Sequence, residues 1–123
     1  YQQFLHLGEA GLAASMFFVV VSKMLAPEEE KDNWGARKAM QTFESRRTIV
    51  ARRLAEAPYM AGDAFTAADI SITYALQFAS RAGGVPLTEA EQAYVAHTTD
   101  RDAYRRAMDT CQATKEWAAA LGE

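Results

Sequence analysis

One stretch of the sequence decides the fold: PYMAGDAFTAADI, from Pro58 to Ile70. Thr66, followed three residues later by Asp69, has the spacing of a capping box, in which each side chain accepts a hydrogen bond from the other residue's backbone N–H. Phe65 and Ile70 stand at the two positions of a hydrophobic staple, just before the cap and at the fourth helical residue. Few polar residues follow. We therefore predict that a buried central helix of a bundle begins here, and that Asp69 is structural and not catalytic.

On either side of this stretch, proline and glycine divide the chain into helical blocks. The breaks fall at Pro27, at residues 58–62 and at residues 83–86. Helical blocks are expected at about 1–25, about 27–56, from Thr66, from near Thr88 (with Glu91 at capping-box spacing), and from about 100 to Leu121. No sustained two-residue alternation indicates a strand. The sequence predicts an all-α protein: a helical bundle of five to six helices in one domain, residues 1–123.

Apolar residues at helical spacing predict which faces form the core. The stripe of the first block comprises Phe4, Leu7, Gly11, Ala14, Phe18 and Leu25. The stripe of the second comprises Ala36, Ala39, Met40, Phe43, Val50 and Leu54, with Arg47 among them, and Pro27 is expected in the first turn of that helix. Val19, Val21 and Trp34 lie off these stripes. We interpret them as an interface between two copies of the chain; the alternative is that they pack against a further domain, which would leave a monomer.

Composition excludes several classes of function. Half of the 123 residues are apolar, 24% are charged, and the net charge is -3, so general attraction to nucleic acid or to an anionic membrane is not expected. The longest apolar stretch, residues 11–21, is shorter than the ~20 residues that span a bilayer. The lone cysteine, Cys111, cannot form an internal disulfide, which suits a reducing compartment. One cysteine and two histidines form no metal-binding pattern. We expect a cytoplasmic protein without a metal.

Three segments resemble the C-terminal, all-helical domain of cytosolic glutathione S-transferases. The stretch from Tyr59 to Ile70 is similar to the family's Y-L-x-G-D-x-F-T-x-A-D-I signature, with Met60 at the leucine position. Residues 4–12, with Phe-Leu-His followed by Glu and Leu, are similar to W-L-H-F-A-E-x-x-L. Residues 100–107 are similar to x-R-P-A-Y-x-R-A, with Asp102 at the proline position. The resemblance covers nearly the whole chain.

The resemblance implies a function shared between two domains. In this family a thioredoxin-like domain, absent from residues 1–123, binds glutathione and supplies the group that activates its thiol. The helical domain forms most of the pocket for a hydrophobic electrophile and much of a homodimer interface. We therefore expect no catalytic residue and no cofactor in this chain, glutathione as co-substrate, and no conjugating activity from the chain alone. The alternative is a non-catalytic interaction module, as in translation elongation factor gamma subunits and extensions of aminoacyl-tRNA synthetases.

Candidate substrate-binding residues lie on the first helical block. His6 and Glu9 share one face, and they either belong to a substrate pocket with Ala13 and Met16 as its apolar floor, or form an ordinary surface pair. The resemblance favours the pocket, and it makes Glu9 the candidate to reach a partner subunit's glutathione amine.

Two further polar residues have more than one interpretation. Arg47 either meets a carboxylate across a dimer interface, or packs its stem and extends its head into water. His97 is expected to interact with the carbonyls at a helix end and with water.

Overall fold

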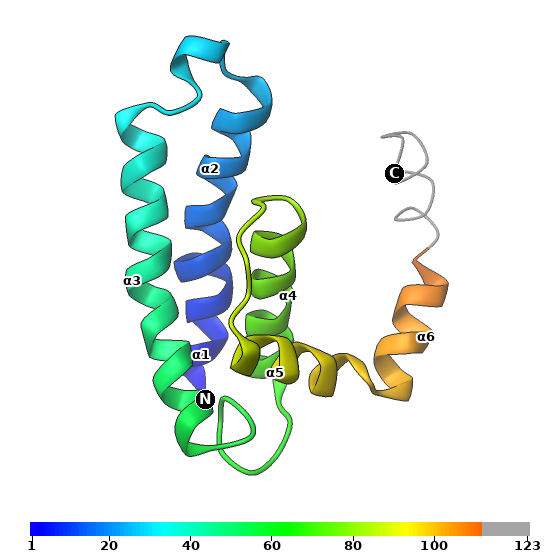
Figure 1. The fold of residues 1–123 in the computed structure, drawn as a ribbon. Helices are drawn as coiled ribbons and strands as arrows, with labels where there is room; N and C mark the ends of the chain where they lie inside the picture. The colour runs from blue at the N-terminus through cyan, green and yellow to red at the C-terminus, as the bar shows by residue number, and fades with distance from the viewer. Residues whose placement is uncertain (112–123) are drawn as a thin grey trace.

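Residues 1–111, the part of the chain that the computed structural model describes, form helices joined by loops (Figure 1). The elements are α1 (Gln2–His6), the π-helix η1 (Leu7–Ala13), α2 (Ala14–Leu25), the 3-10 turn η2 (Glu28–Glu30), α3 (Trp34–Glu56), α4 (Ala67–Arg81), α5 (Glu89–Thr99) and α6 (Asp102–Thr110). Because α1, η1 and α2 are continuous, the described residues hold five helices and no strand, which confirms the predicted all-α bundle. The predicted extension of the last helix to Leu121 lies outside the described residues.

The first helix packs against both α3 and α4. Figure 1 shows α2 and α3 as long antiparallel neighbours, with α4 beside them, α5 crossing near one end and α6 standing apart from the long pair. The first helix contacts α4 through α1 and η1, and contacts α3 mainly through α2. Leu12, Met16, Phe43, Ile72 and Leu76 are completely buried where these elements meet, and they form the centre of the core.

The π-helix η1 changes which face of the first helix is buried. Its hydrogen bonds link residues i and i+5, so each turn holds about one residue more than an α-helical turn. The side chains that follow η1 are therefore rotated around the helix axis, away from the directions that α-helical spacing predicts. The predicted stripe is correct for Phe4 and Gly11 but wrong beyond them, since Phe18 is 64% and Leu25 is 77% exposed. Ala14 is also exposed. Val19, which we assigned to an interface, is buried in the core.

Glycine allows α4 to touch the backbone of η1. A Cβ on Gly8 would lie 2.3 Å from Ser71 Oγ and 2.5 Å from the carbonyl carbon of Ser71, closer than carbon atoms can approach. Ser71 Oγ in turn donates a hydrogen bond to the Leu5 carbonyl oxygen at 2.7 Å. On the α3 side, Arg46 Nη1 donates to the Gly11 carbonyl oxygen at 2.9 Å. The π-helical segment is thus held between α4 and α3.

The second long helix begins later than predicted. Pro27 precedes the short turn η2, and α3 starts only at Trp34, where the Asn33 side chain accepts a hydrogen bond from the Ala36 N–H at 2.9 Å. Asn33 has extended backbone angles, so it ends the preceding turn and caps the new helix. The predicted core stripe is confirmed, with Ala36, Phe43 and Val50 buried and the other members half-buried.

The first helix also meets the length and composition of a membrane span. It runs from Gln2 to Leu25, longer than the apolar stretch considered in the sequence, with a mean hydropathy of 1.7 in its most apolar window. Half of that window is buried inside the fold, as for the core helix of a soluble protein. Length and composition do not separate the two cases, so the cytoplasmic location stays a prediction.

We expect Gly8→Ala to lower the free energy of unfolding by about 1–3 kcal/mol, because the added methyl group forces η1 away from Ser71. Urea denaturation followed by circular dichroism measures the change. Glu9→Ala, at the exposed neighbouring position, is the control and should stay within about 0.5 kcal/mol of the parent. Equal midpoints for Gly8→Ala and the parent would show that the close approach of α4 to η1 is not required.

Candidate functional site

The Asp69 carboxylate is completely buried and receives hydrogen bonds from three segments. Its Oδ2 accepts from the Thr66 N–H at 2.9 Å, which confirms the predicted capping box. Its Oδ1 accepts from the Met60 N–H and from the Tyr94 hydroxyl, both at 2.8 Å. Burial, and secondly the hydrogen bond to this carboxylate, raise the pKa of Tyr94. Asp69 therefore joins the loop before α4, the start of α4 and the middle of α5.

The two staple residues lie on the outer surface of the same helix start. Phe65 makes an edge-to-face contact with Tyr59, at 6.0 Å between ring centroids. The Phe65 ring also contacts Arg101, whose guanidinium carbon lies 3.5 Å from the ring centroid. Ile70 remains 59% exposed, and its packing against Phe65 as a staple stays a prediction. Phe65 and Ile70 both line one end of a groove.

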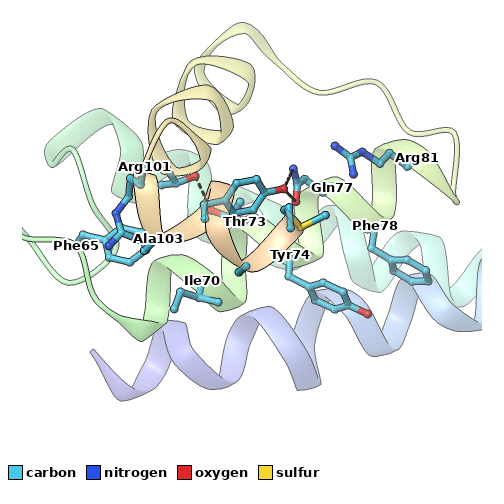
Figure 2. Close-up of a pocket in the computed structure, with 13 residues that line it drawn as sticks. Phe65, Ile70, Thr73, Tyr74, Gln77, Phe78, Arg81, Arg101 and Ala103 are labelled. Carbon is cyan, nitrogen blue, oxygen red and sulfur yellow. Dashed lines mark hydrogen bonds between the residues drawn. The ribbon is translucent and has the colours of Figure 1, made fainter. Parts of the chain in front are cut away.

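This groove runs between α4 and α6 and has a volume of about 580 Å³ (Figure 2). Its walls are mainly apolar, and its aromatic residues come from both helices. One wall carries Ile70, Tyr74 and Phe78 from successive turns of α4, and the other carries Ala103, Tyr104 and Met108 from α6. The volume lies within the range of small-molecule sites, and the mixture of apolar walls with a few polar groups is typical of them.

Four of the uncharged polar side chains that line the groove form two hydrogen-bonded pairs. Gln77 Nε2 donates to the Tyr104 hydroxyl at 3.2 Å and so connects α4 to α6. Thr73 Oγ1 and Thr98 Oγ1 lie 2.7 Å apart at the buried base. These pairs fix the side chains that a ligand would meet. Within the described residues, we find no group of three or more side chains that could hold a metal ion.

The four predicted substrate-binding residues do not share one surface. His6 and Glu9 are exposed on the first helix, whereas Ala13 is buried and Met16 is completely buried in the core. None of the four lines the groove between α4 and α6. The cause is again η1, whose wider turn rotates Met16 inward. Substrate binding by His6 and Glu9 stays a prediction, but without the apolar floor that we assigned to it.

The sequence did contain a signal for the groove. Ile70, Tyr74 and Phe78 are spaced four residues apart, which places them on one face of α4. The opposite face is also apolar and is filled by Ile72, Leu76 and their neighbours in the core. A helix that is apolar on two faces needs a second covering element or a ligand. We interpreted α4 only as a buried helix and missed its outer face.

Arg47 pairs within its own chain, so neither predicted interpretation is correct. Its Nε donates to Glu91 Oε1 at 2.7 Å, and its Nη2 donates to the Pro86 carbonyl oxygen at 2.8 Å. The hydrogen bond to Glu91 raises the pKa of Arg47. Burial acts to raise the pKa of Glu91, but the hydrogen bond and charge of Arg47 and the Thr88 N–H outweigh it, and the pKa falls. The pair joins α3 to α5.

His97 also has a different partner from the one predicted. Its Nε2 lies 2.8 Å from the Tyr59 hydroxyl, within hydrogen-bond distance, and the two rings lie 5.2 Å apart. The side chain therefore contacts the loop before α4 and not the carbonyls at the end of α5. Tyr59 also contacts Phe65, the ring on which Arg101 lies.

Comparisons with models of protein families, with curated proteins and with solved structures found no match for this chain. The class of protein therefore rests on the residues and on their geometry. Together they define an all-α domain with a partly enclosed, largely apolar groove beside a buried capping carboxylate.

We expect Asp69→Ala to lower the free energy of unfolding by at least about 3 kcal/mol. A cap accounts for about 1 kcal/mol, and each buried donor left without an acceptor, at Met60 and Tyr94, adds about 1–3 kcal/mol. Urea denaturation measures the loss. Asp63→Ala, at an exposed position of the same loop, should leave the midpoint unchanged. A small effect at Asp69, equal to that at Asp63, would contradict the role assigned to the buried carboxylate.

Proposed function

We propose that this chain is the helical domain of a cytosolic glutathione transferase, and that the groove between α4 and α6 binds the hydrophobic electrophile. One observation carries the proposal. The stretch that resembles the transferase signature begins α4, and two of its residues, Phe65 and Ile70, line the groove. The signature and the groove are therefore parts of one local structure, and both depend on the same helix start.

The groove suits the acceptor side of such a reaction. Its apolar walls favour an aromatic or alkenyl electrophile, whose transfer out of water contributes about 25 cal/mol per Å² buried. The Tyr104 hydroxyl and the Gln77 amide, held together by their hydrogen bond, are donors that can orient a halide, nitro or carbonyl group. The thiolate would come from glutathione held by a thioredoxin-like domain, as the resemblance implies. Attack of the thiolate sulfur on the electrophile forms a C–S bond without a cofactor: an aryl halide releases its halide ion, and an activated alkene takes up a proton on the neighbouring carbon.

A second surface favours a role in association. Phe18 is 64% and Trp34 is 73% exposed, and both border a shallow depression between α2 and α3 with a volume of about 340 Å³. Exposed aromatic residues that share one patch are typical of protein interfaces. We propose that this patch forms a homodimer interface, with Phe18 and Trp34 in place of the valines first assigned to it. The alternative function, a non-catalytic interaction module, would use the same patch for a different protein.

We expect the complete reading frame that encodes this chain to conjugate glutathione to chlorodinitrobenzene, and residues 1–123 alone to give no turnover above the uncatalysed rate. In the complete protein, Ala103→Trp should lower kcat/KM for the electrophile by at least about tenfold, because the indole fills the groove. Glu89→Ala, exposed and outside the groove, is the control. Turnover by residues 1–123 alone would contradict the division between two domains, and an inactive complete protein would favour the interaction module.

We expect sedimentation velocity to show a reversible dimer whose fraction rises with protein concentration. Trp34→Ala should shift the equilibrium strongly to monomer, because a central aromatic residue commonly contributes ~2 kcal/mol or more to an interface. Tyr74→Ala removes an exposed aromatic residue from a different surface and should leave the dimer unchanged. A chain that stays monomeric at the highest concentration would remove the homodimer and assign the patch to another protein.

A further inference from the structure

We propose that the groove between α4 and α6 selects ligands that join an apolar body to a negative charge, such as aromatic carboxylates and sulfonates. This inference rests on the proposed role of the groove as a ligand site and names the class of ligand. It also names Arg101 as the residue that binds the anionic group. The charges of the groove, the geometry of Arg101 and the shape of the apolar walls support it in turn.

The groove carries positive charge without negative charge. Arg81 and Arg101 line it, and no aspartate or glutamate among the described residues does. Neither arginine forms an ion pair with any residue in 1–111; the same holds for Arg46, Arg52 and Arg106, but those three lie outside the groove. The chain as a whole has a net charge of -3, so this groove is a local exception. Its field therefore attracts anions and disfavours cations.

The carboxylates nearest to Arg101 in sequence are already engaged. Asp100 Oδ1 accepts from Arg105 Nη1 at 2.5 Å, and Asp102 Oδ1 accepts from Arg105 Nη2 at 2.7 Å. Arg105 thus binds both aspartates that flank Arg101. The guanidinium of Arg101 points instead towards Phe65, as Figure 2 shows, and both residues line the groove. A ligand anion would not have to displace a carboxylate of the described residues.

Stacking prepares Arg101 for an anion. Its guanidinium carbon lies 3.5 Å from the centroid of the Phe65 ring, so the flat face of the cation covers the aromatic ring. A stacked guanidinium keeps its N–H groups in its own plane, where they can donate two parallel hydrogen bonds to a carboxylate or sulfonate. Arg101 is half-buried, and part of its hydration is already lost. Little side-chain freedom remains to be lost when the anion binds.

The two arginines lie at opposite ends of the groove (Figure 2). The length of α4 from Ala67 to Arg81 corresponds to about 21 Å at about 1.5 Å per residue. A ligand the size of a few rings therefore reaches only one arginine at a time. Arg101 is the anchor because it is stacked and half-buried, while Arg81 is exposed. With the anion at Arg101, the apolar body extends along Ile70 and Tyr74.

Two probes of nearly equal shape test the charge directly. Anilinonaphthalene sulfonate carries one sulfonate, and phenylnaphthylamine is its neutral counterpart; both fluoresce more strongly in apolar sites. We expect the parent chain to bind the sulfonate about tenfold more tightly or better. Arg101→Gln should lower the affinity for the sulfonate about tenfold and change the affinity for the neutral probe less than about twofold. The affinity of Arg101→Lys for the sulfonate should lie between those of Arg101→Gln and the parent. Arg106→Gln, an exposed arginine outside the groove, is the matched control and should change neither probe.

A blocked groove separates this inference from the proposed function. Ala103→Trp should remove the binding of both probes, and thermal denaturation checks that each variant is folded. If Ala103→Trp leaves both probes bound, the groove is not the ligand site and both proposals fail. If it removes both probes but Arg101→Gln weakens neither, or weakens both equally, the apolar site stands and the selection for anions is overturned.

Discussion

The buried Asp69 carboxylate is the constraint on which the rest of the structure depends. A carboxylate without contact to water is tolerated only when protein donors replace the water, and here the donors come from Thr66, Met60 and Tyr94. These residues belong to the helix start, to the preceding loop and to α5. One side chain therefore fixes where α4 begins, how the loop folds back on it, and where α5 crosses. Phe65, at one end of the groove, is the residue just before this cap.

The start of α5 has the same kind of capping acid as the start of α4. Glu91 closes its own capping box with Thr88 and also accepts a hydrogen bond from Arg47 on α3. In both helices the acid of the capping box bonds to its own helix end and to a side chain from another helix. Local helix initiation and tertiary packing are thereby coupled, because losing either acid removes a cap and a contact between helices at once. The coupling explains why two acids with at most 1% exposure occur in so small a core.

The features that the sequence predicted correctly arise between residues no more than four positions apart in the chain. Thr66 with Asp69, Thr88 with Glu91, and the stripe of α3 all follow from local spacing, and the structure confirms them. The errors have non-local causes. The π-helical turn forms where Gly8 lets α4 approach the backbone, and the partner of Arg47 lies 44 residues away. The groove depends on where α6 lies relative to α4, and no spacing within either helix encodes that.

The two walls of the groove are held with unequal strength. The α4 wall belongs to the core, since its inner face is completely buried at Ile72 and Leu76. The side-chain contacts that hold α6 among the described residues are few, chiefly the Tyr104–Gln77 hydrogen bond and the stacking of Arg101 on Phe65 at its entrance. Movement or substitution of a wall with few contacts costs little stability, whereas the same changes in a wall that belongs to the core cost much. Changes in ligand preference are therefore expected on α6, at Ala103, Tyr104 and Met108, while α4 supplies the constant surface.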